Sequence, residues 1–254
     1  MKVAIFSGPT MRTRQVDISS VFGFESRPPA KRGDIYRAVV GDGVSVVGLI
    51  DGYFGSVPSV LHKEILSAMA KGCTVFGAAS MGALRASELH SFGMIGIGNI
   101  FHDFVCGRLV RDDEVAIEHG PEQVGFAPAS EALVNIRYTL ANAVTCGKIS
   151  DRASDEVTEM AANTRYSRRT LLGALHLYNQ RRPHETISEE TIGWILANKV
   201  DQKFRDGSAL LNAIREFTAG DCNRAQTDLD VKQTRFFTDF RATMDNSLVR
   251  DLVY

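Results

Sequence analysis

The chain has 254 residues, of which 44% are hydrophobic and 23% are charged, as expected for a globular protein that buries a substantial core. Its 29 lysines and arginines nearly balance its 30 aspartates and glutamates, which argues against a nucleic-acid-binding or membrane-surface protein. The apolar runs are too short for a membrane span or a signal peptide, and the cysteines and histidines are scattered, so we expect a cytoplasmic protein with free thiols and no metal site.

The first half of the chain alternates short apolar runs with helical patterns, which predicts an α/β fold with a mainly parallel, Rossmann-like sheet and flanking helices. The predicted strands cover residues 3–6, 21–25, 44–50 and 73–77. The predicted helices cover residues 35–40, 58–71 and 81–90. Asp34 is expected to cap the first of these helices. A glycine-rich connector is predicted at 93–98, and a hairpin at 108–118.

The second half of the chain is predicted to be all-helical. The expected helices cover residues 129–146, 151–162, 168–181, 188–205 and 209–217, followed by a helical pattern within 228–254. We therefore expect two parts, an α/β core domain over residues 1–127 that carries the site and a helical region over residues 128–254 that packs on it. The oligomeric state stays open, a homo-oligomer included.

Loops that follow parallel strands meet at one edge of the sheet, where ligands bind in folds of this kind. Four loops should gather there, at residues 8–10, 28–34, 51–53 and 78–82. The site is expected among them.

Ser80 is the predicted chemical centre, because it lies where a buried strand turns directly into a helix. Its neighbours Gly77, Ala78, Ala79 and Gly82 are small enough for a sharp turn, as in a nucleophile elbow. Ala78 departs from the G-x-S-x-G pattern. Backbone N–H groups at the helix start, near Met81 and Gly82, would stabilise an oxyanion. The alternative is a serine that only caps a packed helix.

A serine nucleophile needs a base, and no histidine is well placed by sequence. A buried lysine with a lowered pKa is the alternative base. The candidates are Lys31, in a loop expected at the same sheet edge, and Lys63, which lies away from the apolar face of its helix. The hypothesis prefers Lys31, and a solvated surface charge is the ordinary role of either lysine.

The segment Asp51-Gly52-Tyr53 ends a buried strand at this edge. Asp51 is interpreted as orienting Lys31, positioning a substrate, or simply stabilising the turn. Gly52 and Tyr53 are predicted substrate contacts.

Several other polar residues have both a functional and an ordinary interpretation. Arg85 suits an anionic substrate group such as a carboxylate, or it pairs with Glu88 three residues later. His62 is a predicted substrate contact. The acidic run 112–114 resembles a metal-binding cluster, but a hairpin turn explains it more simply.

Seven segments of the sequence together resemble the TfuA family. They are residues 27–38, 50–54, 56–66, 75–86, 92–94, 112–116 and 130–137. They cover roughly residues 25–140 in order, and the helical region after about residue 170 is hardly covered.

The resemblance implies a role beside a YcaO enzyme in the thioamidation of a ribosomal peptide backbone. The YcaO partner would use ATP and magnesium to activate a peptide amide, so no cofactor is expected on this chain. The family implies hydrolysis of a ThiS-like, ubiquitin-fold sulfur carrier that ends in a thiocarboxylate, which releases sulfide, and assistance in substrate engagement by YcaO. The Ser–Lys pair attributed to the family carries over to Ser80, while Lys31 and Lys63 both lie in matching segments.

The alternative is a non-catalytic adaptor that recruits a YcaO enzyme or its precursor peptide through the helical half. Exposed side chains among Phe236, Phe237 and Phe240 would favour the adaptor, although packing against the core is the commoner use of such a stripe.

Overall fold

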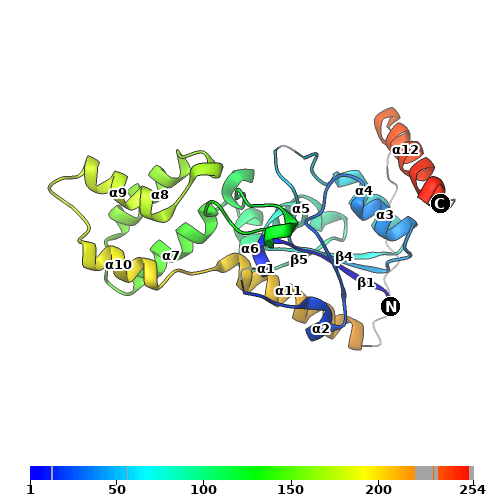
Figure 1. The fold of residues 1–254 in the computed structure, drawn as a ribbon, viewed down its shortest axis with the longest axis horizontal. Helices are drawn as coiled ribbons and strands as arrows, with labels where there is room; N and C mark the ends of the chain where they lie inside the picture. Colours follow the sequence, from blue (N-terminus) through cyan, green and yellow to red (C-terminus); the bar gives the residue numbers. More distant parts are fainter. Residues whose placement is uncertain (13, 56, 221–230, 232–233, 252–254) are drawn as a thin grey trace.

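A computed structural model describes residues 1–12, 14–55, 57–220, 231 and 234–251 of the chain, apart from the side chains of residues 236 and 249–251. Within these residues, five parallel strands form one sheet in the order β2-β1-β3-β4-β5 (Figure 1). The strands are β1 (Val3–Phe6), β2 (Glu25–Arg27), β3 (Val46–Leu49), β4 (Thr74–Ala78) and β5 (Ile95–Ile97). The predicted α/β fold with a parallel sheet is therefore confirmed.

The strand predicted at 21–25 was misplaced, because β2 begins only at Glu25, and strand β5 was not predicted. Residues 18–22 form helix α2 (Ile18–Phe22) instead of a strand, because Asp17 accepts a hydrogen bond from the Ser20 N–H and Gly23 ends the helix in the left-handed conformation. Strand β5 lies within the expected glycine-rich connector, where Gly96 pairs with Gly77 of β4. The glycines of this segment interrupt the apolar pattern by which a strand is usually predicted.

Successive strand residues alternate between two apolar clusters, one on each face of the sheet. Helices α3 (Asp34–Val40), α4 (His62–Ala70) and α5 (Met81–Leu89) cover one face. Helix α11 (Gln202–Ala219) covers the other face with Leu210, Leu211 and Ile214. Burial on both faces explains the continuous apolar strands.

Two helix starts differ from the prediction. Asp34 does not cap α3, since Gly33 is the N-cap residue and the Asp34 carboxylate accepts a hydrogen bond from the Lys31 N–H. Helix α4 begins at His62 and not at residue 58, because the Glu64 carboxylate accepts a hydrogen bond from the Leu61 N–H and fixes the helix start there.

The predicted hairpin at 108–118 was also wrong. After α6 (Asn99–Val105), residues Asp112–Glu114 form a single 3₁₀ turn. Asp113 pairs with Arg111 and with the fully buried Arg169, while Glu114 accepts two hydrogen bonds from Arg137. These pairings tie the turn to the helical half instead of to a second strand.

Helices α7 (Leu133–Thr145), α8 (Asp151–Ala162), α9 (Leu171–Arg181) and α10 (Glu189–Ala197) have their own apolar cluster and form a lobe at the left of Figure 1. The prediction of one helix over 188–205 was wrong. The Asp201 side chain accepts the Phe204 N–H and starts α11 there, and α11 then runs through the predicted helix 209–217. Division of the chain into domains 1–127 and 128–254 stays a prediction.

The last described helix, α12 (Arg235–Asp251), packs on α3. Phe237 is fully buried, and the Tyr36 hydroxyl donates to Asp245 over 2.9 Å. Within the predicted helical pattern 228–254, residues 228–230, 232–233 and 252–254 lie outside the described residues. The remaining short elements are α1 (Pro9–Arg12) and the 3₁₀ turns His90–Phe92, Glu122–Val124 and Tyr166–Arg168.

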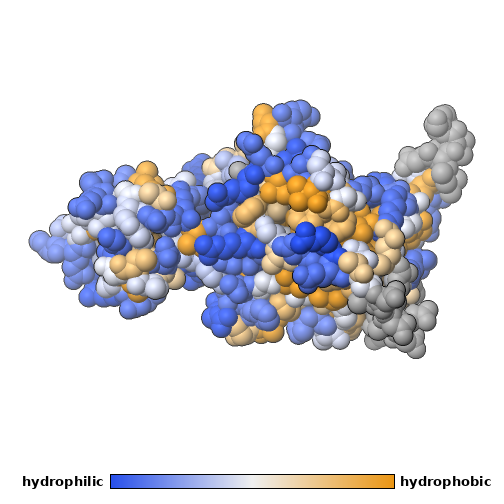
Figure 2. All heavy atoms as spheres, turned by 90° about the horizontal axis from the view of Figure 1, so that it is seen from below, coloured by the Kyte–Doolittle hydropathy of each residue, from blue (hydrophilic) through white to orange (hydrophobic). Residues whose placement is uncertain are grey.

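The surface differs between the two halves of the molecule. Seen from below in Figure 2, the helical lobe is mainly hydrophilic, whereas apolar side chains gather over the α/β part. Of the large apolar side chains that are exposed, Val21, Phe92 and Val110 belong to the α/β half, and Leu172 belongs to the lobe. In the described part of the chain, no helix has both the length and the apolar character that a bilayer crossing needs.

Candidate functional site

The turn between β4 and α5 gives Ser80 its position. Ala79 has a φ of 65°, in the left-handed region that L-residues rarely adopt, and α5 starts at Met81. Gly82 lies so close to β3 that a Cβ there would collide with the carbonyl oxygen of Leu49, and its N–H donates to the Ile50 carbonyl. The small residues therefore press the turn against the sheet, as the sequence pattern predicts.

Ser80 and Lys203 meet at one backbone carbonyl. The Ser80 hydroxyl donates to the carbonyl oxygen of Val115 over 3.4 Å, and the Lys203 amine donates to the same oxygen over 3.0 Å. Ser80 is 5% exposed and Lys203 is 4% exposed. Lys203 lies in the first turn of α11, where its backbone N–H donates to the Asn135 side chain. A hydroxyl and a buried amine thus lie side by side.

The surroundings of Lys203 favour its neutral form. Burial lowers the pKa of the Lys203 amine, because few groups replace the water that would solvate the ammonium ion. The carboxylates of Asp51 and Asp201 raise this pKa and offset part of the burial effect. A neutral lysine can accept a proton from a serine, which makes Lys203 the candidate base for Ser80.

Asp51 holds the loop after β1 against the site. Its carboxylate accepts hydrogen bonds from the N–H groups of Gly8 and Thr10, over 2.8 and 3.1 Å, and from the Thr10 hydroxyl over 2.6 Å. The turn-stabilising interpretation of Asp51 describes these contacts, and its negative charge also acts on Lys203. None of its hydrogen-bond donors is Lys31.

A cavity of about 450 Å³ opens beside Ser80, and we call it the Ser80 cavity. Its lining comes from all four of the predicted sheet-edge loops, from the extended chain after the 112–114 turn, and from the helical lobe. Its lining residues include Asp51, Gly52, Tyr53, Ser80, Val115, Ile117, His119, Tyr166 and Lys203. Both halves of the molecule therefore build the site.

Gly52 lies directly against the start of α5. A Cβ at Gly52 would come 2.7 Å from Cγ of Met81. Among the described residues, no hydrogen bond occupies the backbone N–H of Gly52 or that of Met81. Two backbone donors are thus available next to the serine turn, as an oxyanion site requires.

The structure brings some of the predicted site residues together and separates others. The Ser80 cavity is lined by Ser80, Asp51, Gly52 and Tyr53. The start of α5 contains Met81, which lies against Gly52, and Gly82, which lies against β3. The two predicted lysines do not line this cavity.

Among the described residues, the contacts of the Ser80 hydroxyl and of the Lys63 amine do not join Ser80 to either predicted lysine. Lys31 is exposed. The Lys63 amine donates to the Thr234 hydroxyl over 2.8 Å and lies 5.9 Å from the centre of the Phe237 ring. These contacts direct it towards α12, on the side of the sheet covered by α3 and α4.

His62 and Arg85 belong to a separate polar cluster. Both contact Glu88, His62 over 2.8 Å and Arg85 over 2.7 Å, and Arg85 also donates to the Val60 carbonyl. The ion-pair interpretation of Arg85 therefore describes its contacts. Among the described residues, no group of three His, Cys, Asp or Glu side chains could hold a metal ion.

Lys203 is the residue that the sequence reasoning missed. It lies on the same helical face as Gly207, Leu210 and Ile214, all of which are buried. A lysine on the apolar face of a helix is unusual enough to have signalled a special role. The predicted helices 188–205 and 209–217 divided α11 and hid this pattern.

Comparison with known proteins yields one family. Residues 51–170 match the family model described as TfuA-like protein. The resemblance predicted from the sequence is therefore confirmed over this range, which includes Ser80 and Val115 but ends before Lys203. No curated protein matches the chain.

Proposed function

From the TfuA-like identity of residues 51–170, we propose that this protein is the hydrolytic partner of a YcaO enzyme in peptide backbone thioamidation. Ser80 and Lys203 hydrolyse the terminal thiocarboxylate of a ThiS-like, ubiquitin-fold carrier and release hydrosulfide. The family match supports the association with YcaO systems, while the hydrolysis rests on the geometry of the site.

One observation carries the proposal, namely that the Ser80 hydroxyl and the Lys203 amine donate to the same Val115 oxygen. Catalysis requires that the Ser80 side chain turn its hydrogen bond from Val115 to Lys203. Burial already disfavours the charged amine. A lysine with only a structural role would not need a cavity beside it or an adjacent strained turn that carries a serine.

The reaction follows from these positions. Lys203 takes the proton of Ser80 as Oγ attacks the thiocarboxylate carbon, forming the C–O bond. Collapse of the tetrahedral intermediate breaks the C–S bond, and the Lys203 ammonium returns the proton to sulfur, so that hydrosulfide leaves. Water, deprotonated by Lys203, then attacks the acyl-serine. The C–Oγ bond breaks, the Lys203 ammonium returns the proton to Ser80 Oγ, and the carrier carboxylate is released.

The oxyanion of the tetrahedral intermediate needs hydrogen-bond donors that are not already bonded within the folded protein. The backbone N–H groups of Gly52 and Met81 meet this requirement, as they come from two loops that touch at the serine turn. This pairing of a residue after the nucleophile with a residue of a neighbouring loop is common in serine hydrolases.

Substitution of the nucleophile tests the proposal. With purified thiocarboxylated carrier, Ser80→Ala should lower the rate of hydrosulfide release at least about a thousandfold with little change in thermal stability. Ser87→Ala is the matched control, because Ser87 lies on the same helix and donates only to the Leu84 carbonyl. Undiminished release by Ser80→Ala would refute the proposed nucleophile.

The alternative is a non-catalytic adaptor, and the surface favours the α/β half as its contact region. Phe237 is buried against the protein and Phe240 stacks on it, so this stripe offers little to a partner, and the side chain of Phe236 lies outside the described residues. In a YcaO thioamidation assay with added free sulfide, Ser80→Ala should regain product formation if Ser80 serves only sulfide release. An adaptor without hydrolytic activity would instead give equal product with Ser80→Ala and wild type when the carrier is the only sulfur source.

A further inference from the structure

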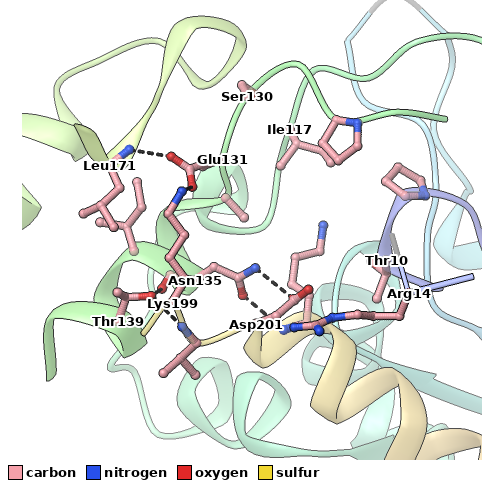
Figure 3. Close-up of a pocket in the computed structure, with 16 residues that line it drawn as sticks. Thr10, Arg14, Ile117, Ser130, Glu131, Asn135, Thr139, Leu171, Lys199 and Asp201 are labelled. Atoms are coloured by element: carbon pink, nitrogen blue, oxygen red, sulfur yellow. Dashed lines mark hydrogen bonds and ion pairs between the residues drawn. The ribbon is translucent and has the colours of Figure 1, made fainter. Parts of the chain in front are cut away.

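A second cavity, of about 260 Å³, also has Lys203 in its lining. Figure 3 shows this cavity with Arg14, Glu131 and Lys199 around it. We call it the Arg14 cavity. It shares Pro9, Ile117 and Lys203 with the Ser80 cavity. Lys203 is 4% exposed at its inner end, whereas Lys199 is 45% exposed and Arg14 is exposed at its outer part. The two cavities therefore adjoin one another at Lys203.

Most polar groups of the Arg14 cavity already have partners. Glu131 accepts hydrogen bonds from the Leu171 N–H and the Lys199 amine. The Asn135 amide donates to Asp201, and the Thr139 hydroxyl accepts from the Val200 N–H. Figure 3 shows these pairs along one wall. They build the cavity and leave little capacity for a ligand.

The donors that stay available are cationic. Arg14 reaches into the cavity from the N-terminal part of the chain (Figure 3), and its guanidinium stacks on the Phe204 ring at 5.6 Å. Among the described residues, the ring of Phe204 is the contact of that guanidinium, and no hydrogen bond or ion pair is made to it. The Lys199 amine uses one of its three protons on Glu131. Free cationic donors around a small cavity favour an anion.

The charge of the cavity depends on Lys203. The other charged groups in its lining are Arg14 and Lys199, which are positive, and Glu131 and Asp201, which are negative. These four charges cancel, so the cavity is neutral while Lys203 is neutral and carries one net positive charge when Lys203 holds a proton. The donors of Arg14 and Lys199 are available to an anion in either protonation state of Lys203.

We propose that the Arg14 cavity is the anion site through which hydrosulfide leaves while the tail of the carrier fills the Ser80 cavity. The proposal rests on the proposed function, since it needs a protein-sized acyl donor. Such a substrate blocks the opening through which its own tail entered, and the departing sulfur requires a second route. Arg14 and Lys199 line that route, next to the amine that protonates the sulfur.

Bromide, a small monovalent anion, tests the site without any catalysis. In crystals of the full chain soaked in sodium bromide, an anomalous peak should lie within hydrogen-bond distance of Arg14 or Lys199. Arg14→Gln should remove most of the peak, and Arg14→Lys should retain it. Arg12→Gln is the matched control, because Arg12 also stacks on an aromatic ring but lines a different cavity. No peak in the wild type, or an equal peak in Arg14→Gln, would overturn the anion site.

Product inhibition tests the exit route. Added hydrosulfide should inhibit carrier hydrolysis, and Arg14→Gln should raise its inhibition constant about tenfold, the effect of losing one charge-assisted hydrogen bond. An unchanged inhibition constant in Arg14→Gln would refute the exit route even if bromide binds. Failure of the proposed hydrolysis is distinguishable, because the bromide peak is measured on the resting protein and does not depend on Ser80.

Discussion

Two buried titratable side chains lie on opposite faces of the sheet and have different roles. Glu64, in the first turn of α4, accepts backbone hydrogen bonds from Gly33, Tyr36 and Leu61. Lys203, in the first turn of α11, makes one side-chain hydrogen bond, to the Val115 carbonyl. Both are at most 4% exposed.

The two residues differ in the number of their hydrogen-bond partners and in whether a cavity lies beside them. These two features distinguish a structural role from a chemical one. Burial raises the pKa of Glu64 to about 7, although three N–H donors lower it. Glu64 lines neither the Ser80 cavity nor the Arg14 cavity, and its contacts join α3 to α4. Lys203 lies between two cavities with donor capacity to spare. A buried titratable group is the better candidate for a functional role when it has few hydrogen-bond partners and lies beside a cavity.

The comparison predicts that Lys203 lowers stability while it supports activity. Lys203→Met should reduce hydrosulfide release about 10²–10⁴-fold, the usual contribution of a general base. The same change should raise the free energy of unfolding by about 1–4 kcal/mol, because an apolar side chain of similar length replaces a costly buried amine. Steady-state release and denaturant titration measure the two effects.

Lys71→Met is the control for this prediction, since Lys71 is exposed at the end of α4. It should change neither quantity appreciably. A Lys203→Met protein that is less stable than the wild type would mean that Lys203 is a structural residue, and the contrast with Glu64 would disappear.

Glu64 should behave in the opposite way. Glu64→Gln places an amide group against backbone N–H donors and should lower the free energy of unfolding by about 1–3 kcal/mol. Hydrosulfide release at temperatures well below unfolding should stay near the wild-type rate, because Glu64 does not touch the Ser80 cavity. Glu159→Gln, at an exposed position of α8, is the control. A large loss of activity without a loss of stability would contradict this structural role.

The dependence of stability on pH sharpens the contrast. The pKa of Glu64 is about 7 in the folded protein against a model value of 4.5, so the folded state binds more protons between these values. The contribution of Glu64 to the free energy of unfolding is fully present below pH 4.5 and is lost as the pH rises through 7. The free energy of unfolding then falls by up to about 1.4 kcal/mol per pH unit. Chemical unfolding from pH 4.5 to 7.5 should show this fall in the wild type and a weaker fall in Glu64→Gln. Equal slopes would refute it.

The sequence allowed Ser80 to be predicted because its signal is local. A strand, a run of small residues and a helix follow one another within a dozen positions, and backbone sterics limit what such a segment can do. The parallel sheet and the gathering of the loops at 8–10 and 51–53 were predictable for the same reason. Each depends on short patterns and on the rule that ligands bind at strand ends.

Lys203 was not predictable from local patterns, because it reaches Ser80 only through the path of the chain between them. The lobe of α7–α10 intervenes before α11 returns to the sheet. Lys31 and Lys63 were preferred because they are near Ser80 in the sequence and in the family pattern. The wrong helix break near residue 205 then concealed the apolar face on which Lys203 lies.

Asp51 gives the smallest and most specific test of the comparison, because its charge acts on Lys203, whereas Glu64 has no cationic partner of this kind. The Asp51 carboxylate raises the pKa of Lys203 against the effect of burial. An asparagine can keep the bonds from the Gly8 and Thr10 N–H groups and donate to the Thr10 hydroxyl. Asp51→Asn should therefore lower the pKa of Lys203 further. Because the neutral amine is the base, the rise of the hydrosulfide-release rate with pH should move to lower pH. A uniform drop in rate with an unmoved midpoint would limit Asp51 to holding the loop.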